Sequence, residues 1–177
     1  MPDRNLLFTL PFFFSFNSLL FAQQGRIDSL LHLLRLSPED THKVTLLSNL
    51  CVEYRITDNY DSAMYYGSNA LILGNKIFSQ HSVKNQSGIK KLIAVAYNNI
   101  GGVYWRKGYY DKALENFFES LNIRKEIDDK IGIASSYNNI GVAYKEKGNF
   151  DRALENFYAS LKIKEQRKNS LTKLLVI

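Results

Sequence analysis

The chain contains one pattern of residues twice, at a spacing of forty residues. Ala94–Ile123 and Ala134–Ile163 are identical at 18 of 30 positions when they are aligned without a gap. A fixed internal period of about 20–50 residues indicates a solenoid, in which each unit packs on its neighbours in the chain. The repeat therefore limits the possible folds more than any other feature of the sequence.

Each copy predicts two helices joined by a turn. Apolar and small residues recur every three or four positions in both halves of the copy, as they do along one face of a helix. Gly108 is expected to end the first helix, because glycine supplies the backbone freedom of a C-cap, and Asp111 is expected to cap the second helix. The predicted stripes of the first copy are Tyr97, Ile100, Gly101 and Tyr104, then Ala113, Leu114, Phe117, Ser120 and Leu121. Their counterparts are Tyr137, Ile140, Gly141, Tyr144, Gly148, Asp151, Ala153, Leu154, Phe157, Ser160 and Leu161.

A more divergent copy lies before these two, fifty residues ahead of the next, with about ten extra residues in Gly74–Gly88. Further upstream, Ile27–Leu36 is amphipathic, and "SPED" at Ser37–Asp40 predicts a helix start with Ser37 as the cap and proline at the first helical position. The acidic turn Asp128–Lys130 separates the last two copies. We therefore expect an all-α solenoid of stacked helical hairpins, with seven helices and no strand.

The N-terminus has the composition of a secretory signal peptide. Arg4 precedes an apolar stretch from Leu6 to Phe21, which is followed by the small residue Ala22 and by polar residues. The stretch is about 16 residues long, shorter than the roughly 20 that a spanning helix needs. We predict cleavage near Ala22 and a periplasmic or secreted mature chain; the alternative is an anchor that is retained.

These boundaries give the expected organisation. Residues 1–22 form the signal peptide and residues 23–43 an N-terminal helix with a linker. Three repeats span about 44–80, 94–127 and 134–168, and residues 169–177 form a tail that could be a truncated next repeat.

The charge pattern argues against nucleic acid as a partner. The net charge is +6, but 23 basic residues are interleaved with 17 acidic ones. Such mixing is typical of a solvated surface rather than of a nucleic-acid footprint. Cys51 is the only cysteine, so an internal disulfide is excluded.

The sequence contains no recognisable catalytic motif. Metal-ligand spacing is missing among His32, His42 and His81, and no phosphate-binding glycine loop follows a strand-like segment. Glu115 and Glu155 occupy one repeat position, which favours a solvated helix face over an acid–base pair. We expect a non-enzymatic protein without a cofactor, a metal or a small-molecule substrate.

The repeats resemble the tetratricopeptide repeat family. The shared pattern is an aromatic or leucine residue, an aliphatic residue three positions later, a small residue, a tyrosine, and a glycine that ends the helix; it covers about Val44 to Lys168. The period is forty rather than thirty-four, and Lys125 and Glu165 stand where the family has proline. Longer repeats of this kind resemble those of kinesin light chains and LGN-type adaptors, which implies longer helices and a different superhelical pitch.

The predicted binding surface is the concave groove lined by the first helices. Asn49, Asn99 and Asn139 recur at one repeat position and are expected to form a row along it. In the adaptors that the chain resembles, asparagines at this position hold the main chain of a bound peptide. The interpretations left open are that these amides tie neighbouring helices together or only face solvent. The other candidate groove residues are Asn98, Asn138, Arg55, Trp105, Arg106 and Lys145.

Two functions are compatible with this pattern. The first is an exported interaction module that binds a peptide or protein segment in its groove, with membrane contact only if the N-terminal segment is retained or the chain is a fragment. The alternative is the periplasmic sensing portion of a larger signalling protein, such as a membrane histidine kinase or a transcriptional regulator. A reading frame that continues past Ile177 into more repeats and a membrane span would favour the alternative.

Overall fold

The computed structural model of the chain describes the backbone of residues 10–80 and 86–175, and side chains from residue 23 to residue 169 within these ranges. This part of the chain is all-α, with seven helices and no strand, as predicted. The helices are α1 (Leu10–Leu36), α2 (Thr41–Ile56), α3 (Tyr60–Gln80), α4 (Gln86–Arg106), α5 (Tyr110–Glu126), α6 (Lys130–Glu146) and α7 (Phe150–Leu175).

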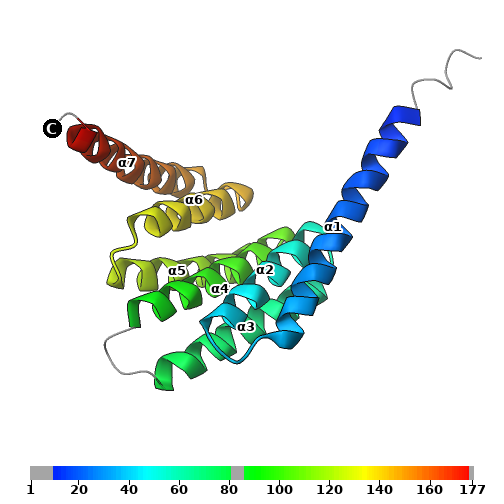
Figure 1. The fold of residues 1–177 in the computed structure, drawn as a ribbon. Coiled ribbons are helices and arrows are strands. Elements are labelled where there is room, and N and C mark those ends of the chain that lie inside the picture. The colour runs from blue at the N-terminus through cyan, green and yellow to red at the C-terminus, as the bar shows by residue number, and fades with distance from the viewer. Residues whose placement is uncertain (1–9, 81–85, 176–177) are drawn as a thin grey trace, which may run out of the picture.

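The helices pair into three hairpins that stack on one another, α2 with α3, α4 with α5, and α6 with α7 (Figure 1). Contacts join each helix to the next one along the chain, and α2 also contacts α4. The first helices α2 and α4 therefore lie beside each other, as neighbouring first helices do in a solenoid.

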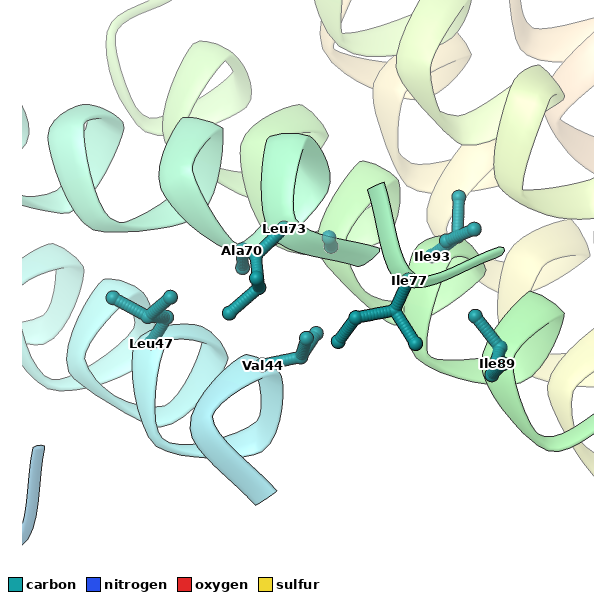
Figure 2. Packing of buried hydrophobic residues seen from close by; sticks show 8 residues of the cluster. Val44, Leu47, Ala70, Leu73, Ile77, Ile89 and Ile93 are labelled. Carbon is teal, nitrogen blue, oxygen red and sulfur yellow. The ribbon is translucent and has the colours of Figure 1, made fainter. Parts of the chain in front are cut away.

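The extra residues between the first and second hairpins lengthen two helices. α3 and α4 each have 21 residues, whereas α5 and α6 each have 17. The added turns carry part of the core, because Ile89 in the first turn of α4 packs in a cluster with Val44 and Ile77 (Figure 2). The insertion thus adds apolar surface that this interface buries.

Glycine ends the first helices of the two similar repeats, as predicted. Gly108 and Gly148 have φ angles of +78° and +77°. Their N–H groups donate to the carbonyls of Trp105 and Lys145, at 3.0 and 2.9 Å. Most residues with a Cβ would be strained in this left-handed conformation. Each glycine thus lets the chain turn sharply into the second helix of its hairpin.

The predicted cap residues of two helices are wrong. α5 begins at Tyr110, so Asp111 lies in its first turn rather than at its cap. Asp40 caps α2, accepting a hydrogen bond from the Lys43 N–H at 3.0 Å. The Ser37 hydroxyl instead donates to the Leu33 carbonyl at the end of α1. A polar residue between two helices can bond to the end of the preceding helix or to the start of the following one. The residue at which each helix ends or begins decides which of the two it does.

Asparagine caps the second helices of the first and third hairpins. The side-chain oxygens of Asn59 and Asn149 accept hydrogen bonds from the N–H groups of Ser62 and Arg152, at 3.1 and 3.2 Å. Each asparagine satisfies one of the free N–H groups in the first turn.

Close packing within the hairpins explains the glycines of the first helices. A Cβ placed on Gly101 would lie 2.7 Å from the ring of Phe117. One placed on Gly141 would lie 2.7 Å from the ring of Phe157. The first hairpin reverses this arrangement, with Cys51 on the first helix and Gly67 on the second, where a Cβ would be 3.0 Å from the Cys51 sulfur. The larger side chain lies on the first helix here and the glycine on the second, and the two helices still pack closely.

Two residues predicted to be buried in the third repeat are exposed. Leu114 and Leu121 on α5 are 6% and 2% exposed, whereas their counterparts Leu154 and Leu161 on α7 are 53% and 49% exposed. α6 packs over the outer face of α5, and no described helix packs over the same face of α7. The sequence pattern is the same, so the difference comes from the neighbour.

The predictions for the N-terminus concern mostly residues outside the described side chains. Residues 1–9 lie outside the described residues, and the predicted cleavage point at Ala22 lies within α1. Among the helices of the described part, none combines the length and the apolar content needed to cross a membrane.

Candidate functional site in the groove of the first helices

A half-open cavity of about 200 Å³ lies along the three first helices, with one residue from α5 in its lining. It contains five of the candidate residues, contributed by all three repeats. The lining residues are Arg55 of α2, then Asn98, Asn99, Gly102 and Trp105 of α4, Phe117 of α5, and Asn139 and Val142 of α6. The structure therefore brings together Arg55, Asn98, Asn99, Trp105 and Asn139, which are separated by up to 84 positions in the sequence.

Two of the three recurring asparagines link adjacent repeats. The Asn99 amide donates to the Ser48 carbonyl at 3.2 Å, from α4 to α2. The Asn139 amide donates to the side-chain oxygen of Asn98 at 2.8 Å, from α6 to α4. In both cases the amide donates to a residue of the preceding first helix. The acceptor stands one position before the counterpart of the donor: Ser48 precedes Asn49, and Asn98 precedes Asn99. The interpretation of these amides as ties between helices thus describes Asn99 and Asn139 in this structure.

The tie between Asn139 and Asn98 leaves part of each amide available. Within the described part of the chain, the Asn98 nitrogen and the Asn139 oxygen have no hydrogen-bond partner, and neither atom is among the buried unpaired ones. The cavity therefore offers one free donor and one free acceptor on adjacent helices. This pair of groups matches the C=O and N–H of a peptide backbone.

Arg55 gives the cavity a positive charge. Its guanidinium lies across Gly102, where a Cβ would be 3.4 Å from the Arg55 Nε. No carboxylate lines the cavity, and Arg55 forms no ion pair with any described residue. The Arg55 Nε and the Trp105 Nε1 are buried without a hydrogen-bond partner among the described residues. A buried donor left unpaired costs about 1–3 kcal/mol, so this part of the groove is not fully satisfied by the chain itself.

Asn49 and Asn138 lie outside the cavity and are exposed. Asn49 lies on α2, the first helix of the first hairpin, so no hairpin precedes it that could supply a hydrogen-bond acceptor. It lines a separate cavity of about 570 Å³ between α1 and α2. Asn138 is the counterpart of Asn98, and no described helix follows to donate to it. The predicted row is therefore continuous only through the middle repeat.

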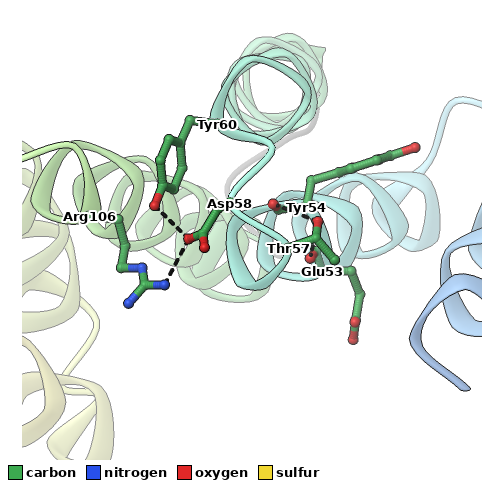
Figure 3. A network of polar contacts seen from close by, with 6 residues as sticks. All are labelled: Glu53, Tyr54, Thr57, Asp58, Tyr60 and Arg106. Atoms are coloured by element: carbon green, nitrogen blue, oxygen red, sulfur yellow. Dashed lines mark hydrogen bonds and ion pairs between the residues drawn. The ribbon is translucent and has the colours of Figure 1, made fainter. Parts of the chain in front are cut away.

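Arg106 and Lys145 form ion pairs at the surface. Arg106 donates to the Asp58 carboxylate at 2.8 Å, and the Tyr60 hydroxyl donates to the same oxygen at 2.5 Å (Figure 3). The hydrogen bond from Tyr60, followed by that from Arg106, lowers the pKa of Asp58 below its ordinary value. Lys145 lies 3.4 Å from Glu146. Both cations are exposed and lie outside the cavity.

Two features of the interior were missed from sequence. Gly102 lies against the Arg55 side chain and leaves room for it. The sequence indicates this position because the corresponding residues of the other repeats are valines. Arg124 is 6% exposed, and its Nη1 donates to the Gly132 carbonyl and the Ser136 hydroxyl, both at 2.8 Å. Burial lowers the pKa of Arg124 from its ordinary value. No periodic pattern marks a buried arginine, because the corresponding positions hold glycine and lysine.

Within the described residues, no group of three or more histidine, cysteine, aspartate or glutamate side chains could hold a metal ion. The cavity lining carries amides, one guanidinium, an indole and apolar groups. Such a set provides hydrogen bonds and contact area for binding.

Comparison with known families agrees with this architecture. Residues 92–166 match a model of the tetratricopeptide repeat family. These residues are tetratricopeptide repeats. They comprise most of the second and third hairpins, with the Asn139–Asn98 contact inside the matched segment, and the first hairpin repeats their geometry. Proteins of this family are in general non-catalytic scaffolds that bind other proteins.

Solved structures share the tetratricopeptide repeat fold. BtubC (BKLC) from P. vanneervenii aligns with 81% of this chain at a TM-score of 0.66 and 21% identity. The apo form of RapI aligns with 82% at a TM-score of 0.65 and 24% identity. The chain spans 59% and 40% of the lengths of these two proteins. At such identities the likeness concerns the fold. No curated protein sequence matches the chain.

Proposed function

We propose that the chain binds an extended peptide, or an extended segment of a protein, in the groove of its first helices. The observation that carries this proposal is the pair of free amide groups on Asn98 and Asn139 inside one cavity. A peptide backbone presents a carbonyl and an N–H along one edge, and it would satisfy both groups at once.

The charge and shape of the cavity favour a segment with an acidic residue. Arg55 is the only charged residue in the lining. A carboxylate beside its guanidinium would form a charge-assisted pair in a site that Trp105 and Phe117 partly shield from water. An arginine in place of that carboxylate would be repelled. Specificity would therefore come from Arg55 and Trp105, and the asparagines would hold the main chain.

A pocket-filling variant tests the proposal. Gly102→Val adds bulk to the floor of the cavity, and valine already occupies the corresponding positions 52 and 142. Gly88→Val is the matched control, because Gly88 lies on the same helix and a Cβ there has no atom within 4 Å. A library of random peptides selected against the immobilised full-length chain would supply the ligands.

We expect Gly102→Val to weaken binding of the selected peptides at least tenfold, and Gly88→Val to bind them like the wild type. Selected sequences should be enriched in aspartate and glutamate. Circular dichroism must show equal helicity for both variants. Unchanged affinity of a well-folded Gly102→Val protein would exclude the groove as the binding site.

We further propose that the mature chain acts in the periplasm or outside the cell, after cleavage near Ala22. The support is the tripartite composition of residues 1–22. Mass spectrometry of the protein after expression with its own N-terminus tests this proposal. A mature N-terminus near Gln23 is expected, and an intact Met1 would contradict cleavage.

A further inference from the structure

α7 carries a stripe of large apolar side chains that the described chain leaves open. Four such residues follow one another along the helix at spacings of four, four and three positions, so they share one face. They span about 16 Å of helix. They are Phe150, Leu154, Tyr158 and Leu161, with exposed fractions of 64%, 53%, 67% and 49%.

The corresponding face of α5 shows how such a stripe is normally covered. Leu114 and Leu121 are buried there because α6 packs across them. α7 has the same leucines in the same places, and a contiguous exposed apolar patch of this kind marks an interaction surface. Phe118, the counterpart of Tyr158, stays 37% exposed, so the part of the α7 face that resembles a covered surface centres on Leu154 and Leu161. A helix covers these positions one repeat earlier, and a helix would fit them here.

The charges along α7 are distributed unequally. Asp151, Arg152 and Glu155 lie in its first two turns, and Lys162, Lys164, Glu165 and Arg167 follow further along, so the first group is net negative and the second is net positive. Asp151 and Lys164 are both exposed, and neither forms an ion pair with another described residue. A helix of the same sequence running in the opposite direction would place acidic groups beside basic ones at both ends.

We propose that the α7 stripe is covered by the α7 stripe of a second copy of this chain, in an antiparallel, two-fold symmetric pair. In the register that centres the pair between Phe157 and Tyr158, Leu154 of each copy meets Leu161 of the other. Asp151 lies three residues before Leu154, and Lys164 lies three residues after Leu161. Asp151 of each copy therefore meets Lys164 of the other copy. One surface that pairs with itself in this way forms a closed dimer.

Light scattering coupled to size-exclusion chromatography tests the pair on the full-length chain. The mass of one copy is 20.4 kDa, and the wild type should elute with twice that mass. Leu161→Glu should elute as a monomer, because two charges would enter the apolar contact. Ile72→Glu is the matched control and should remain dimeric, since Ile72 is 65% exposed on α3, away from this face. A monomeric wild type, or a dimeric Leu161→Glu, would overturn the proposal.

A charge exchange tests the orientation. Asp151→Lys alone should weaken the dimer about 2- to 10-fold, because it faces Lys164 of the second copy with a like charge. Adding Lys164→Asp should restore the wild-type dissociation constant, since each pair then has opposite charges again. If the double variant is weaker than the single one, the antiparallel register is wrong.

Disulfide trapping tests the same register independently of stability. Leu154→Cys protein mixed with Leu161→Cys protein should form mainly the mixed disulfide. Like positions lie about 10 Å apart along an antiparallel pair, beyond the reach of a disulfide. The native Cys51 is buried and should not interfere. Equal yields of the mixed and the like-with-like disulfides would overturn the register.

Discussion

The side-chain amide of Asn139 donates a hydrogen bond of 2.8 Å to the side-chain oxygen of Asn98, and this bond joins α6 to α4. The two residues hold adjacent positions in the repeated motif "YNNIG", one repeat apart. The second asparagine of each motif donates toward the preceding repeat, to the Ser48 carbonyl from Asn99 and to the Asn98 side chain from Asn139, whereas the first asparagine accepts such a bond only in the first motif. Both partners of an inter-repeat contact are encoded in five residues.

Loss of this contact should lower the stability of the chain. We expect Asn139→Ala to reduce the free energy of unfolding by about 1 kcal/mol, the usual net value of one hydrogen bond. The neighbouring Asn138→Ala should change it by less than about 0.5 kcal/mol, because Asn138 is exposed and makes no such bond. Urea denaturation followed by circular dichroism measures both. Equal midpoints for the two variants would show that the contact contributes nothing.

The adjacent glycines of α4 should respond in opposite ways to alanine. Gly101→Ala places a Cβ 2.7 Å from the Phe117 ring, so we expect it to destabilise the fold by about 1–3 kcal/mol. Gly102→Ala meets nothing closer than 3.4 Å and gains helix propensity, worth up to about 1 kcal/mol of added stability. Thermal unfolding of both proteins checks the difference.

A second substitution shows whether the Phe117 ring is the cause. In a Phe117→Leu background, Gly101→Ala should cost less than it does in the wild type, because the shorter side chain leaves room for the Cβ. If the cost is the same in both backgrounds, contact with the ring does not explain it.

Cys51 should be unreactive in the folded protein. Burial raises the pKa of its thiol to about 11, so the thiolate is scarce at neutral and mildly alkaline pH. Iodoacetamide at pH 8 should label the chain slowly without denaturant and rapidly in concentrated urea. Mass spectrometry measures the labelled fraction. Fast labelling of the native protein would mean that the first hairpin opens readily around Cys51.

The contact among Asp58, Tyr60 and Arg106 should make stability depend on acid pH. Because the pKa of Asp58 in the folded state lies below its ordinary value, the ionised carboxylate stabilises the fold above that ordinary value. This stabilisation is lost as the pH falls through the lowered folded-state pKa. The effect should be small and reduced by salt, since the groups are exposed.

Carbon-detected NMR of the Asp58 carboxyl checks this directly. Its titration midpoint should lie below that of a free aspartate, and both Tyr60→Phe and Arg106→Gln should raise it, because each removes a group that stabilises the ionised carboxylate. The same midpoint in all three proteins would contradict the contact.

The sequence was informative about the hairpins and much less so about the site. Tyr97, Ile100, Gly101 and Phe117 recur at helical spacing, so the helices and their packing followed from periodicity. The cap of α2 was misplaced, because Ser37 and Asp40 are both good caps and only the neighbouring contacts choose between them. For the groove, the pattern predicted a row of asparagines, but it did not show that the Asn99 amide donates to the Ser48 carbonyl.

The sequence by itself determined the hairpin, since the order of apolar, small and turn residues that defines it is local and is written twice almost unchanged. The tertiary structure decided what each identical position does. Leu121 is buried and Leu161 is half exposed because α6 follows one and no described helix follows the other. Asn49, Asn99 and Asn139 share a repeat position, yet only the latter two have a preceding first helix to bond to. In a solenoid the environment of a residue depends on which repeats flank it, and a repeated sequence cannot carry that information.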